Sequence, residues 1–512
     1  MHFRSILFTS SPDGTGTRAE QQPDSFVDLR LDQIVDAALA GREEYDLRPF
    51  FHAPLGEVDE IAYRHGVLHD LEEPALRLLI ETFAKEMRDV RAQIAQSRKL
   101  YYEYPRAIWF LDAAGLYCRA VMNLGDGLRA HRPSSEGLRG LSEYLESYVA
   151  SDAFASLVRE TRSVQDGLSE VRYRLHVETS RVTVTKEDEE VTDYSDEITA
   201  TFEKFRQGAA RDYRVAFPSH PEMNHLEASI LDAVRKLFPE VFAALRSYVE
   251  RRRDFVDAVI SRFDQEVQFY LGYLALIDPL RAAGLPFCFP AVSRASKAVH
   301  ARETFDLALA HKLNPLGKSP VRNDFRMEGN ERALVVTGPN QGGKTTFARA
   351  FGQLHHLARL GLPVPGEAAR LFLCDQLFTH FEREEQLADL QGRLQDELVR
   401  FHEILDLATA DSIIVMNESF ASTTLEDALF IGRQVLSQIL ERDILCVYVT
   451  FLDELSTLSE ATVSMVSEVE TSDPTTRTYK ISRRPANGLA YALAIAEKHG
   501  LTYQALRRRV AR

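Results

Sequence analysis

The chain has 512 residues, a formal net charge of −15 at pH 7 and 45% hydrophobic residues, enough for two to four domains with sizeable cores. Its four cysteines (Cys118, Cys288, Cys374 and Cys446) lack the spacing of a zinc site or a disulfide framework. The sequence contains no long apolar run, so neither a membrane-spanning helix nor a secretory signal is expected.

The first half of the chain has mainly helical patterning. Residues 1–30 are polar, and we expect one short strand there, from Phe3 to Phe8. From Leu31 to Leu168 apolar residues recur at helical spacing, as at Leu76 and Ile80, and proline and glycine divide this stretch into several helices.

A short stretch in the middle of the chain changes period. Residues 171–185 alternate between apolar side chains, such as Tyr173 and Leu175, and polar ones, which predicts a small pair of strands. An acidic turn follows at residues 186–190. Helical spacing then resumes and continues from about residue 224 to residue 280.

A glycine-rich segment in the second half carries the strongest chemical signal. The apolar run Leu334–Val336 predicts a buried strand, and Phe347–Leu360 is compatible with a helix. Between them, G-x-x-x-x-G-K-[ST] is typical of a loop whose backbone N–H groups bind phosphates at a helix N-terminus. Lys344 would reach the β- and γ-phosphates, and Thr345 would bind Mg²⁺. The expected nucleotide-binding residues are Gly338, Pro339, Asn340, Gln341, Gly342, Gly343, Lys344, Thr345 and Thr346.

The form of this loop resembles that of the MutS family of DNA mismatch-repair ATPases. Further segments resemble that family in the same order along the chain: Asp375–Thr379, Glu397–Leu405, Ser412–Thr424, Val449–Leu455, Tyr479–Ile481 and Asn487–Ala496. The resemblance implies an α/β P-loop (ABC-type) ATPase domain at residues 290–512, ending in dimerisation helices. It also implies a mainly helical core or lever-like domain at residues 31–289, with a clamp-like β insertion near residues 171–223.

The resemblance implies an ATPase that uses ATP and Mg²⁺ and forms a homodimer through the ATPase domain. We expect a cytoplasmic protein, associated with the nucleoid when it binds DNA, that acts as a nucleotide-gated clamp on DNA structures. Standard mismatch reading is not expected, because few residues precede the first strong helix. Two Phe-x-Glu matches, at Phe238–Glu240 and Phe401–Glu403, fall within helical or ATPase segments.

Three positions depart from the family pattern. Asn417 stands where an acid usually supports Mg²⁺, while Glu418, the expected catalytic carboxylate, is retained; Thr345 and Asn417 are the expected metal-binding pair. Phe451 replaces a histidine that senses the γ-phosphate, and packing is the favoured interpretation of its ring. Arg393 aligns with a serine/threonine pair and is either a trans-acting arginine or a surface residue. These departures predict slow hydrolysis.

The acidic net charge requires any DNA contact to use a local basic surface. Three arginine groups are candidates, although each is also compatible with a solvated surface: Arg251–Arg253; Arg172, Arg174 and Arg181; and Arg507–Arg509. The alternative function is an ATP-gated module that binds protein or RNA, with weak or no ATPase activity. An SMC-type or transporter-type ATPase is disfavoured, because the chain has no Leu-Ser-Gly-Gly motif.

Overall fold

The structure of the protein is a computed structural model, and its chain divides into two compact units. The structure describes residues 3, 5–9, 22–178, 181–187, 225–382, 392–470 and 476–486. The first unit contains residues 1–2, 74–132 and 140–261, and the second contains residues 3–73, 133–139 and 262–512. No helix in the described ranges combines the length and the apolar composition needed to cross a membrane.

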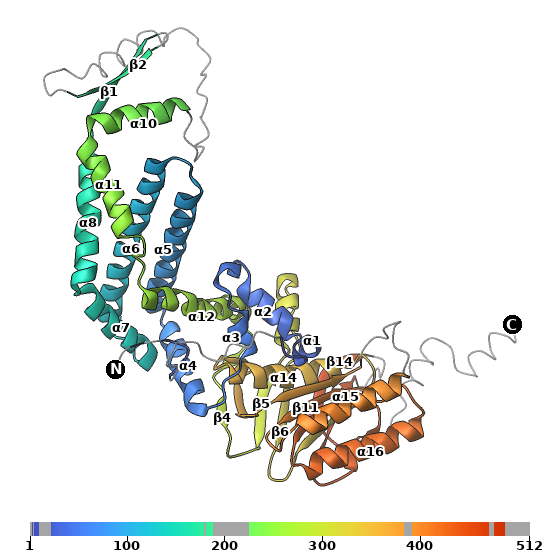
Figure 1. The fold of residues 1–512 in the computed structure, drawn as a ribbon. Helices are drawn as coiled ribbons and strands as arrows, with labels where there is room; N and C mark the ends of the chain where they lie inside the picture. The colour runs from blue at the N-terminus through green and yellow to red at the C-terminus, as the bar shows by residue number, and fades with distance from the viewer. Residues whose placement is uncertain are drawn as a thin grey trace, which may run out of the picture. The chain divides into compact units, whose positions relative to one another are not determined.

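The first unit is mainly helical (Figure 1). Its elements are α5 (Pro74–Lys99), α6 (Glu103–His131), most of α7 (Glu136–Val149), α8 (Asp152–Ser169), β1 (Tyr173–Glu178), β2 (Arg181–Lys186), α10 (His225–Leu237) and α11 (Pro239–Arg251). The helical spacing seen in the sequence has a direct cause, because Leu76, Ile80 and Phe83 are all buried along α5. The Ser151 side chain caps α8 by accepting a hydrogen bond from the backbone N–H of Phe154.

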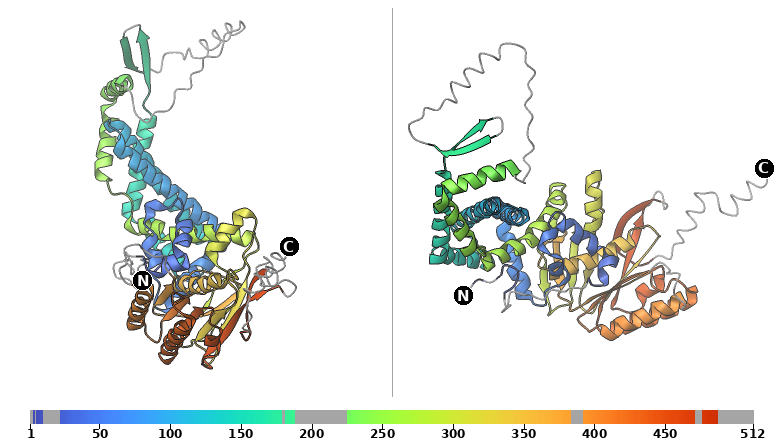
Figure 2. Two further views of the ribbon diagram at one scale, coloured as in Figure 1. Left: turned by 90° about the vertical axis from the view of Figure 1, so that its right-hand side faces the viewer. Right: turned by 45° about the horizontal axis from the view of Figure 1, so that its top comes forward.

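The strand pair predicted near residues 171–185 is confirmed. β1 and β2 form an antiparallel hairpin in which Leu175 pairs with Val184 and His176 pairs with Thr183. Figure 2 shows this hairpin from two further sides. Of the two Phe-x-Glu matches, one begins at Phe238, the N-cap of α11, and runs into that helix, and the other begins at Phe401, a buried residue of α15. The prediction that both fall in helical or ATPase segments is confirmed.

The second unit combines helices with two larger sheets. Its N-terminal elements are α1 (Ser25–Leu29), α2 (Leu31–Leu39), η1 (Glu43–Tyr45), α3 (Arg48–His52) and α4 (Val58–Leu71), and most of α12 (Ala258–Ala282) follows. The middle elements are β3 (Phe287–Cys288), β4 (Ala291–Ser293), β5 (Val299–Thr304), α13 (Leu307–Leu313), η2 (Asn314–Leu316), β6 (Asn323–Met327), β7 (Ala333–Thr337), α14 (Lys344–Arg359), β8 (Val364–Pro365) and β9 (Ala368–Phe372). The C-terminal elements are β10 (Leu377–Phe381), α15 (Arg393–Leu407), β11 (Ile413–Asn417), α16 (Leu425–Glu441), β12 (Leu445–Val449), η3 (Asp453–Thr457), β13 (Thr462–Val469) and β14 (Arg477–Arg483).

Within the described residues, the larger sheet has six strands in the order β10-β11-β12-β7-β13-β14. All neighbours are parallel except β13 and β14, so the chain is mixed α/β with a mainly parallel sheet. Residues of α15 and α16 pack in one core cluster with β7, β11 and β12, and Figure 1 shows α14 on the other side of the sheet. The described part of the second large sheet has the order β4-β9-β5-β6.

The N-terminal residues enter the core of the second unit without forming a strand. Ile6 and Leu7 are fully buried, and residues 5–9 have no regular secondary structure. Both carboxylate oxygens of Glu266 lie 2.9 Å from the Ser5 hydroxyl, and one accepts the Ile6 N–H at 2.8 Å. The hydroxyl of Tyr270 donates to the Ile6 carbonyl at 2.8 Å. The strand predicted from Phe3 to Phe8 is therefore wrong, because side chains satisfy these backbone groups.

This buried carboxyl makes the stability of the unit depend on pH. Burial raises the pKa of Glu266 from its ordinary value of 4.5 to about 7. Below the pKa that Glu266 has in the unfolded chain, the raised pKa of the folded state contributes its full share to stability. This contribution is lost as the pH rises through the pKa of the folded state. We therefore expect the unfolding free energy of the wild type to fall by about 2 kcal/mol more than that of Glu266→Gln between about pH 5 and pH 8.

Urea unfolding at both pH values would measure the difference. Glu250→Gln, at an exposed glutamate of α11, is the matched control and should keep the wild-type pH dependence. The same pH dependence in Glu266→Gln and in the wild type would contradict the assignment of this effect to Glu266.

Candidate nucleotide-binding site

The carboxyl ends of neighbouring parallel strands meet at one edge of the six-stranded sheet. The register pairs Asn417, the last residue of β11, with Val449 of β12, and pairs Val449 with Val336 of β7. The backbone N–H of Thr450 continues this alignment by donating to the Val336 carbonyl at 3.0 Å. Residues that follow these strands are therefore held close together, at the edge where ligands bind in open α/β sheets.

The segment between β7 and α14 has a backbone that needs glycine. Gly338 and Gly343 have φ values of 118° and 91°, in the region that favours glycine. A Cβ atom at Gly342 would lie 2.3 Å from the Ser467 hydroxyl and 2.9 Å from the Pro339 carbonyl oxygen. Gly338 and Gly342 thus let this loop fold tightly against Ser467 of β13, and Gly343 is the left-handed N-cap of α14.

Lys344, the first residue of α14, is buried within this loop with 4% of its surface exposed. Its ammonium donates to the carbonyl oxygens of Gly338 and Pro339 at 3.0 and 3.1 Å, and to the Asn340 side-chain oxygen at 3.4 Å. Burial lowers the pKa of Lys344, while the Glu418 carboxylate, 3.9 Å away, acts in the opposite direction. The loop therefore holds a cation whose present partners are mainly neutral oxygens.

Two further predicted residues meet across the site. The Thr345 hydroxyl donates to the Asn417 side-chain oxygen at 2.8 Å, which joins the start of α14 to the end of β11. Glu418 follows directly and has a φ of 51°. Its backbone N–H donates to the Val449 carbonyl at 2.9 Å, so its position is fixed by the neighbouring strand.

A pocket of about 570 Å³ opens beside the loop. Its lining residues are Leu309, Leu313, Ser319, Pro320, Val321, Asn323, Gln341, Gly342, Gly343, Lys344, Thr345, Thr346, Glu418 and Tyr479. One part of this wall is polar and belongs to the loop and Glu418, and another part is apolar and belongs mostly to α13 and the segment before β6. The volume falls in the range of small-molecule and cofactor sites.

Tyr479 is a pocket residue whose role the sequence did not indicate. It lies on β14 with a φ of 58°, which is unusual for a non-glycine residue. Asn323 holds it there by donating to the Tyr479 carbonyl at 3.2 Å and accepting the Ile481 N–H at 2.7 Å. A Cβ atom on Gly343 would lie 3.6 Å from Tyr479, so this residue stands over the end of the loop.

A buried polar network supports the backbone after Glu418. His380 has its two ring nitrogens 2.7 Å from the Ser419 hydroxyl and 3.0 Å from the Glu397 carbonyl oxygen. The Glu397 carboxylate accepts the N–H of Phe420 at 2.7 Å, and Phe420 has a φ of 62°. Because a left-handed backbone is unfavourable for a bulky residue, these contacts stabilise the turn that carries Glu418.

The ring of Phe451 is more exposed than the sequence analysis predicted. Its side chain is 48% exposed and does not line the pocket, so the prediction that it packs is wrong. The residue lies in a bend directly after β12, where the chain leaves the sheet. Gly392 is the N-cap of α15, and the side chain of Arg393 lies outside the described part of the structure.

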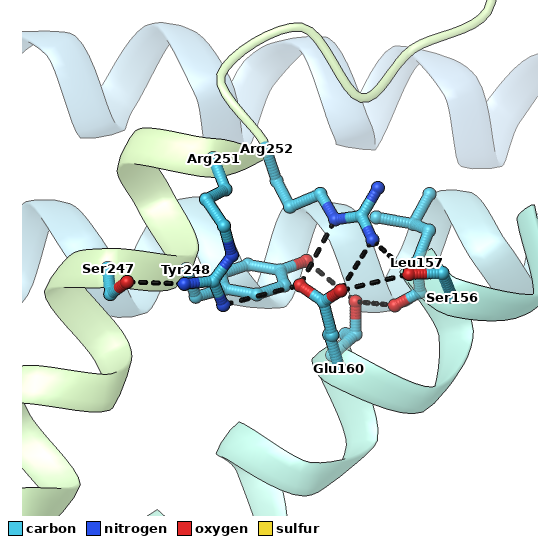
Figure 3. A network of polar contacts seen from close by, with 8 residues as sticks. Ser156, Leu157, Glu160, Ser247, Tyr248, Arg251 and Arg252 are labelled. Atoms are coloured by element: carbon cyan, nitrogen blue, oxygen red, sulfur yellow. Dashed lines mark hydrogen bonds and ion pairs between the residues drawn. The ribbon is translucent and has the colours of Figure 1, made fainter. Parts of the chain in front are cut away.

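The arginine group at residues 251–253 is largely paired (Figure 3). Arg252 contacts the two carboxylate oxygens of Glu160 at 2.7 and 3.3 Å, and Arg251 approaches one of them at 3.4 Å. The hydrogen bond from Arg252 is the main reason why the pKa of Glu160 falls to about 2. Two of the three cations therefore join α11 to α8, which supports the structural interpretation of this group. Residues 507–509 lie outside the described residues.

Comparison with known proteins gives a family match for the second half of the chain. Residues 334–510 match the family described as MutS domain V, which is the ATPase domain of those proteins. The chain is 29% identical to the endonuclease MutS2 of Thermus thermophilus over 205 residues, 39% of this chain and 27% of the relative. It is 26% identical to the endonuclease MutS2 of Gemmatimonas aurantiaca over 262 residues, 51% of this chain and 31% of the relative.

A DNA mismatch repair protein MutS, from Clostridium kluyveri, is 28% identical over 299 residues, 56% of this chain and 33% of the relative. The chain therefore matches only about a third of the length of these curated relatives. The matched family region includes most of the six-stranded sheet and the loop with Lys344. Residues 334–510 therefore form a domain of the MutS domain V family, and the chain is similar to MutS proteins over this region.

Proposed function

We propose that this protein is an ATP-hydrolysing, DNA-binding switch of the MutS type, which closes on DNA structures when ATP binds and resets after hydrolysis. The observation that carries the proposal is the convergence of Lys344, Thr345 and Glu418 on one pocket beside a glycine-rich loop, with Asn417 hydrogen-bonded to Thr345. In this proposal, residues 290–512 form the ATPase domain and residues 31–289 form the lever-like domain with its clamp near residues 171–223.

The residues of the pocket fit a nucleoside triphosphate. The glycines of the loop stand where a Cβ atom would be crowded or strained, so the backbone carries no side chain there. The Lys344 ammonium could replace its hydrogen bonds to the loop carbonyl oxygens with hydrogen bonds to phosphate oxygens. The proposed nucleotide contacts are those of Gly338, Pro339, Asn340, Gln341, Gly342, Gly343, Lys344, Thr345 and Thr346. The apolar wall with Leu309 and Leu313, facing Tyr479, offers a surface for the base.

Thr345 and Asn417 are the proposed residues beside Mg²⁺. Among the described residues no group of three or more His, Cys, Asp or Glu side chains could hold a metal ion. The Thr345 hydroxyl and the Asn417 amide oxygen suit Mg²⁺, which usually keeps several waters and binds through few protein ligands and the substrate phosphates. When bound, the ion would neutralise charge on the phosphates. Asn417 offers a neutral oxygen in place of a carboxylate, which supports slow hydrolysis.

Glu418 is the proposed catalytic carboxylate. Its backbone is fixed by Val449 and by the network around His380 and Glu397, and its side chain lines the pocket. From there it would orient the attacking water and accept its proton, while Lys344 would stabilise negative charge on the phosphates.

We further propose that the protein binds DNA as a homodimer joined through its ATPase domains. The names of the MutS relatives refer to DNA mismatch repair or to an endonuclease, and the family likeness is the support for a DNA partner. The proposed dimerisation helices, near residues 490–510, lie outside the described residues. Analytical ultracentrifugation with saturating nucleotide should give a dimer, and a monomer under that condition would contradict this part.

A second candidate function is an ATP-gated module that binds protein or RNA with weak or no turnover. The neutral Asn417, the half-exposed Phe451 and the net charge of −15 favour it. Steady-state Mg²⁺-ATP hydrolysis with plain duplex, mismatched or branched DNA separates the two functions. A rate that responds to one DNA form supports the first, whereas ATP binding without turnover or any DNA effect supports the second.

Asn417→Asp is expected to speed up hydrolysis and to lower the Mg²⁺ concentration needed for half-maximal rate. The carboxylate can still accept the Thr345 hydrogen bond and adds the charge that Mg²⁺ prefers. A gain of about 1–3 kcal/mol in the transition state corresponds to roughly ten- to hundredfold in rate. Hydrolysis measured against Mg²⁺ checks this, with Asn417→Ala as the control that lacks both the hydrogen bond and the charge. An unchanged Mg²⁺ requirement in Asn417→Asp would exclude a metal-supporting role for this position.

A further inference from the structure

The turn between α5 and α6 exposes aromatic side chains. α5 ends at Lys99 and α6 begins at Glu103. Tyr101, in this turn, is 89% exposed, which is unusual for an aromatic residue, and Trp109 on α6 is 37% exposed. The rings of Tyr101 and Tyr102 meet edge to face, with their centroids 5.3 Å apart. These rings are available to a partner outside the helical unit.

The turn is also fixed rather than loosely attached. The Ser97 hydroxyl donates to the Arg106 carbonyl at 2.9 Å, which ties the last turn of α5 to the first turns of α6. Tyr104 is buried against Phe242 of α11, and Arg246 donates to the Tyr104 hydroxyl at 3.0 Å. Because the backbone of the turn is held on both sides, presenting Tyr101 to a ligand requires little further ordering.

Positive charge surrounds these aromatic side chains. Arg98 and Lys99 lie in the last turn of α5 and Arg106 in the first turns of α6, and all three are exposed. Among the described residues none of the three forms an ion pair or a side-chain hydrogen bond. The nearby acid, Glu103, is already paired with Arg246 at 2.7 Å. The turn is therefore a local basic surface in an acidic chain. Contacts with the phosphates of a nucleic acid require a surface of this kind, because the net charge of the chain is negative.

We propose that this turn, with Tyr101, Trp109 and the cations of Arg98, Lys99 and Arg106, is a binding site for single-stranded nucleic acid. Unpaired bases expose ring faces that stack on aromatic side chains, and the phosphates pair with the cations. Paired bases within a blunt duplex have no free ring face. The inference rests on the proposed DNA-binding function and specifies it: the partner would be DNA with single-stranded segments, as in tails, gaps or branches.

An anionic membrane is the competing partner for an aromatic and basic surface. Membrane insertion requires an extended apolar face, whereas the exposed aliphatic side chain nearest this turn is Ile108, at 36% exposure. Two tyrosines with polar hydroxyls and three cations fit stacked bases and phosphates better. Vesicles of anionic phospholipid are therefore included in the test as a separate arm.

The chain contains one tryptophan, Trp109, so its fluorescence reports on this site without a label. The full-length protein is titrated with oligothymidylate at low salt, while anisotropy of a labelled oligothymidylate and of a labelled blunt duplex gives the affinities. We expect saturable quenching of Trp109 by oligothymidylate. Tyr101→Ala should weaken the affinity about tenfold. Tyr101→Phe, which keeps the ring, should bind as the wild type does.

Leu78→Ala is the matched control, because Leu78 is 64% exposed near the other end of the same helix. Its affinity should equal that of the wild type, and circular dichroism should show that all variants keep their helices. Lys99→Gln and Arg106→Gln should reduce the dependence of the affinity on salt.

The outcomes distinguish the binding site proposed at this turn from the DNA-binding function proposed for the protein. DNA binding that neither quenches Trp109 nor responds to Tyr101→Ala would overturn the inference and leave the proposed function standing. Failure to bind any DNA form would overturn both. Quenching by anionic vesicles but not by oligothymidylate would overturn the nucleic-acid assignment and identify the turn as a membrane contact.

Discussion

Lys344→Ala is expected to weaken ATP binding by roughly a hundredfold or more. The wild-type ammonium is buried and already oriented by the carbonyl oxygens of Gly338 and Pro339, so it can form charged hydrogen bonds with phosphates without further ordering. Hydrogen bonds to charged groups contribute about 1.5–3 kcal/mol each, and about 1.4 kcal/mol corresponds to a factor of ten in affinity. Two such contacts account for the expected loss.

Titration with a fluorescent ATP analogue would measure this change directly. Lys85→Ala, at an exposed lysine of α5, removes the same charge from the helical unit and should leave the affinity unchanged. If Lys344→Ala bound ATP as tightly as the wild type, the pocket beside α14 would not be the triphosphate site. A melting temperature equal to that of the wild type would show that the variant folds.

Glu418→Gln is expected to reduce the single-turnover rate of ATP hydrolysis by about 10²–10⁴ while retaining ATP binding. Glutamine keeps the shape of the side chain and its backbone contact with Val449, but it cannot take a proton from water. Removing the carboxylate also removes a negative charge 3.9 Å from the Lys344 ammonium. ATP affinity should therefore stay equal or increase slightly, which distinguishes this variant from Lys344→Ala.

The control for this variant is Glu441→Gln, at an exposed carboxylate at the end of α16. Quenched-flow measurement of one turnover, beside equilibrium ATP binding, separates chemistry from affinity. A Glu418→Gln enzyme that turns over at the wild-type rate would rule out Glu418 as the catalytic base. Loss of binding together with turnover would indicate a structural role for the carboxylate instead.

The polar half of the site was predictable because it is local in sequence. β7, the glycine-rich loop and α14 follow one another along the chain, so the apolar run, the glycines and Lys344 indicate strand, turn and helix without any knowledge of distant contacts. Helical spacing likewise indicated the helices between residues 31 and 168. Asn417 was indicated by the resemblance of Ser412–Thr424 to the MutS family, and the structure places it at the end of a short buried strand.

The apolar half of the pocket depends on tertiary structure. Leu309, Pro320 and Tyr479 come from three separate segments, and only the packing of β14 beside β6 brings Tyr479 to the loop. The network of His380, Ser419 and Glu397 is similarly non-local, and no short pattern marks it. Phe451 was misjudged because an apolar residue usually suggests packing, whereas here the chain bends away from the sheet at that residue.

The N-terminal helices have a consequence for how the protein is synthesised. The Gln353 side chain on α14 donates to the Leu29 carbonyl and to Asp306, each at no more than 2.9 Å, and its own carbonyl accepts the Leu307 N–H. Leu29 and Gln353 are 324 positions apart. A ribosome must therefore complete the helical unit before the first helices can meet the sheet on which they pack. Until then Phe26 and Leu29 lack their native cover, and an interrupted chain is more prone to aggregate than a finished one.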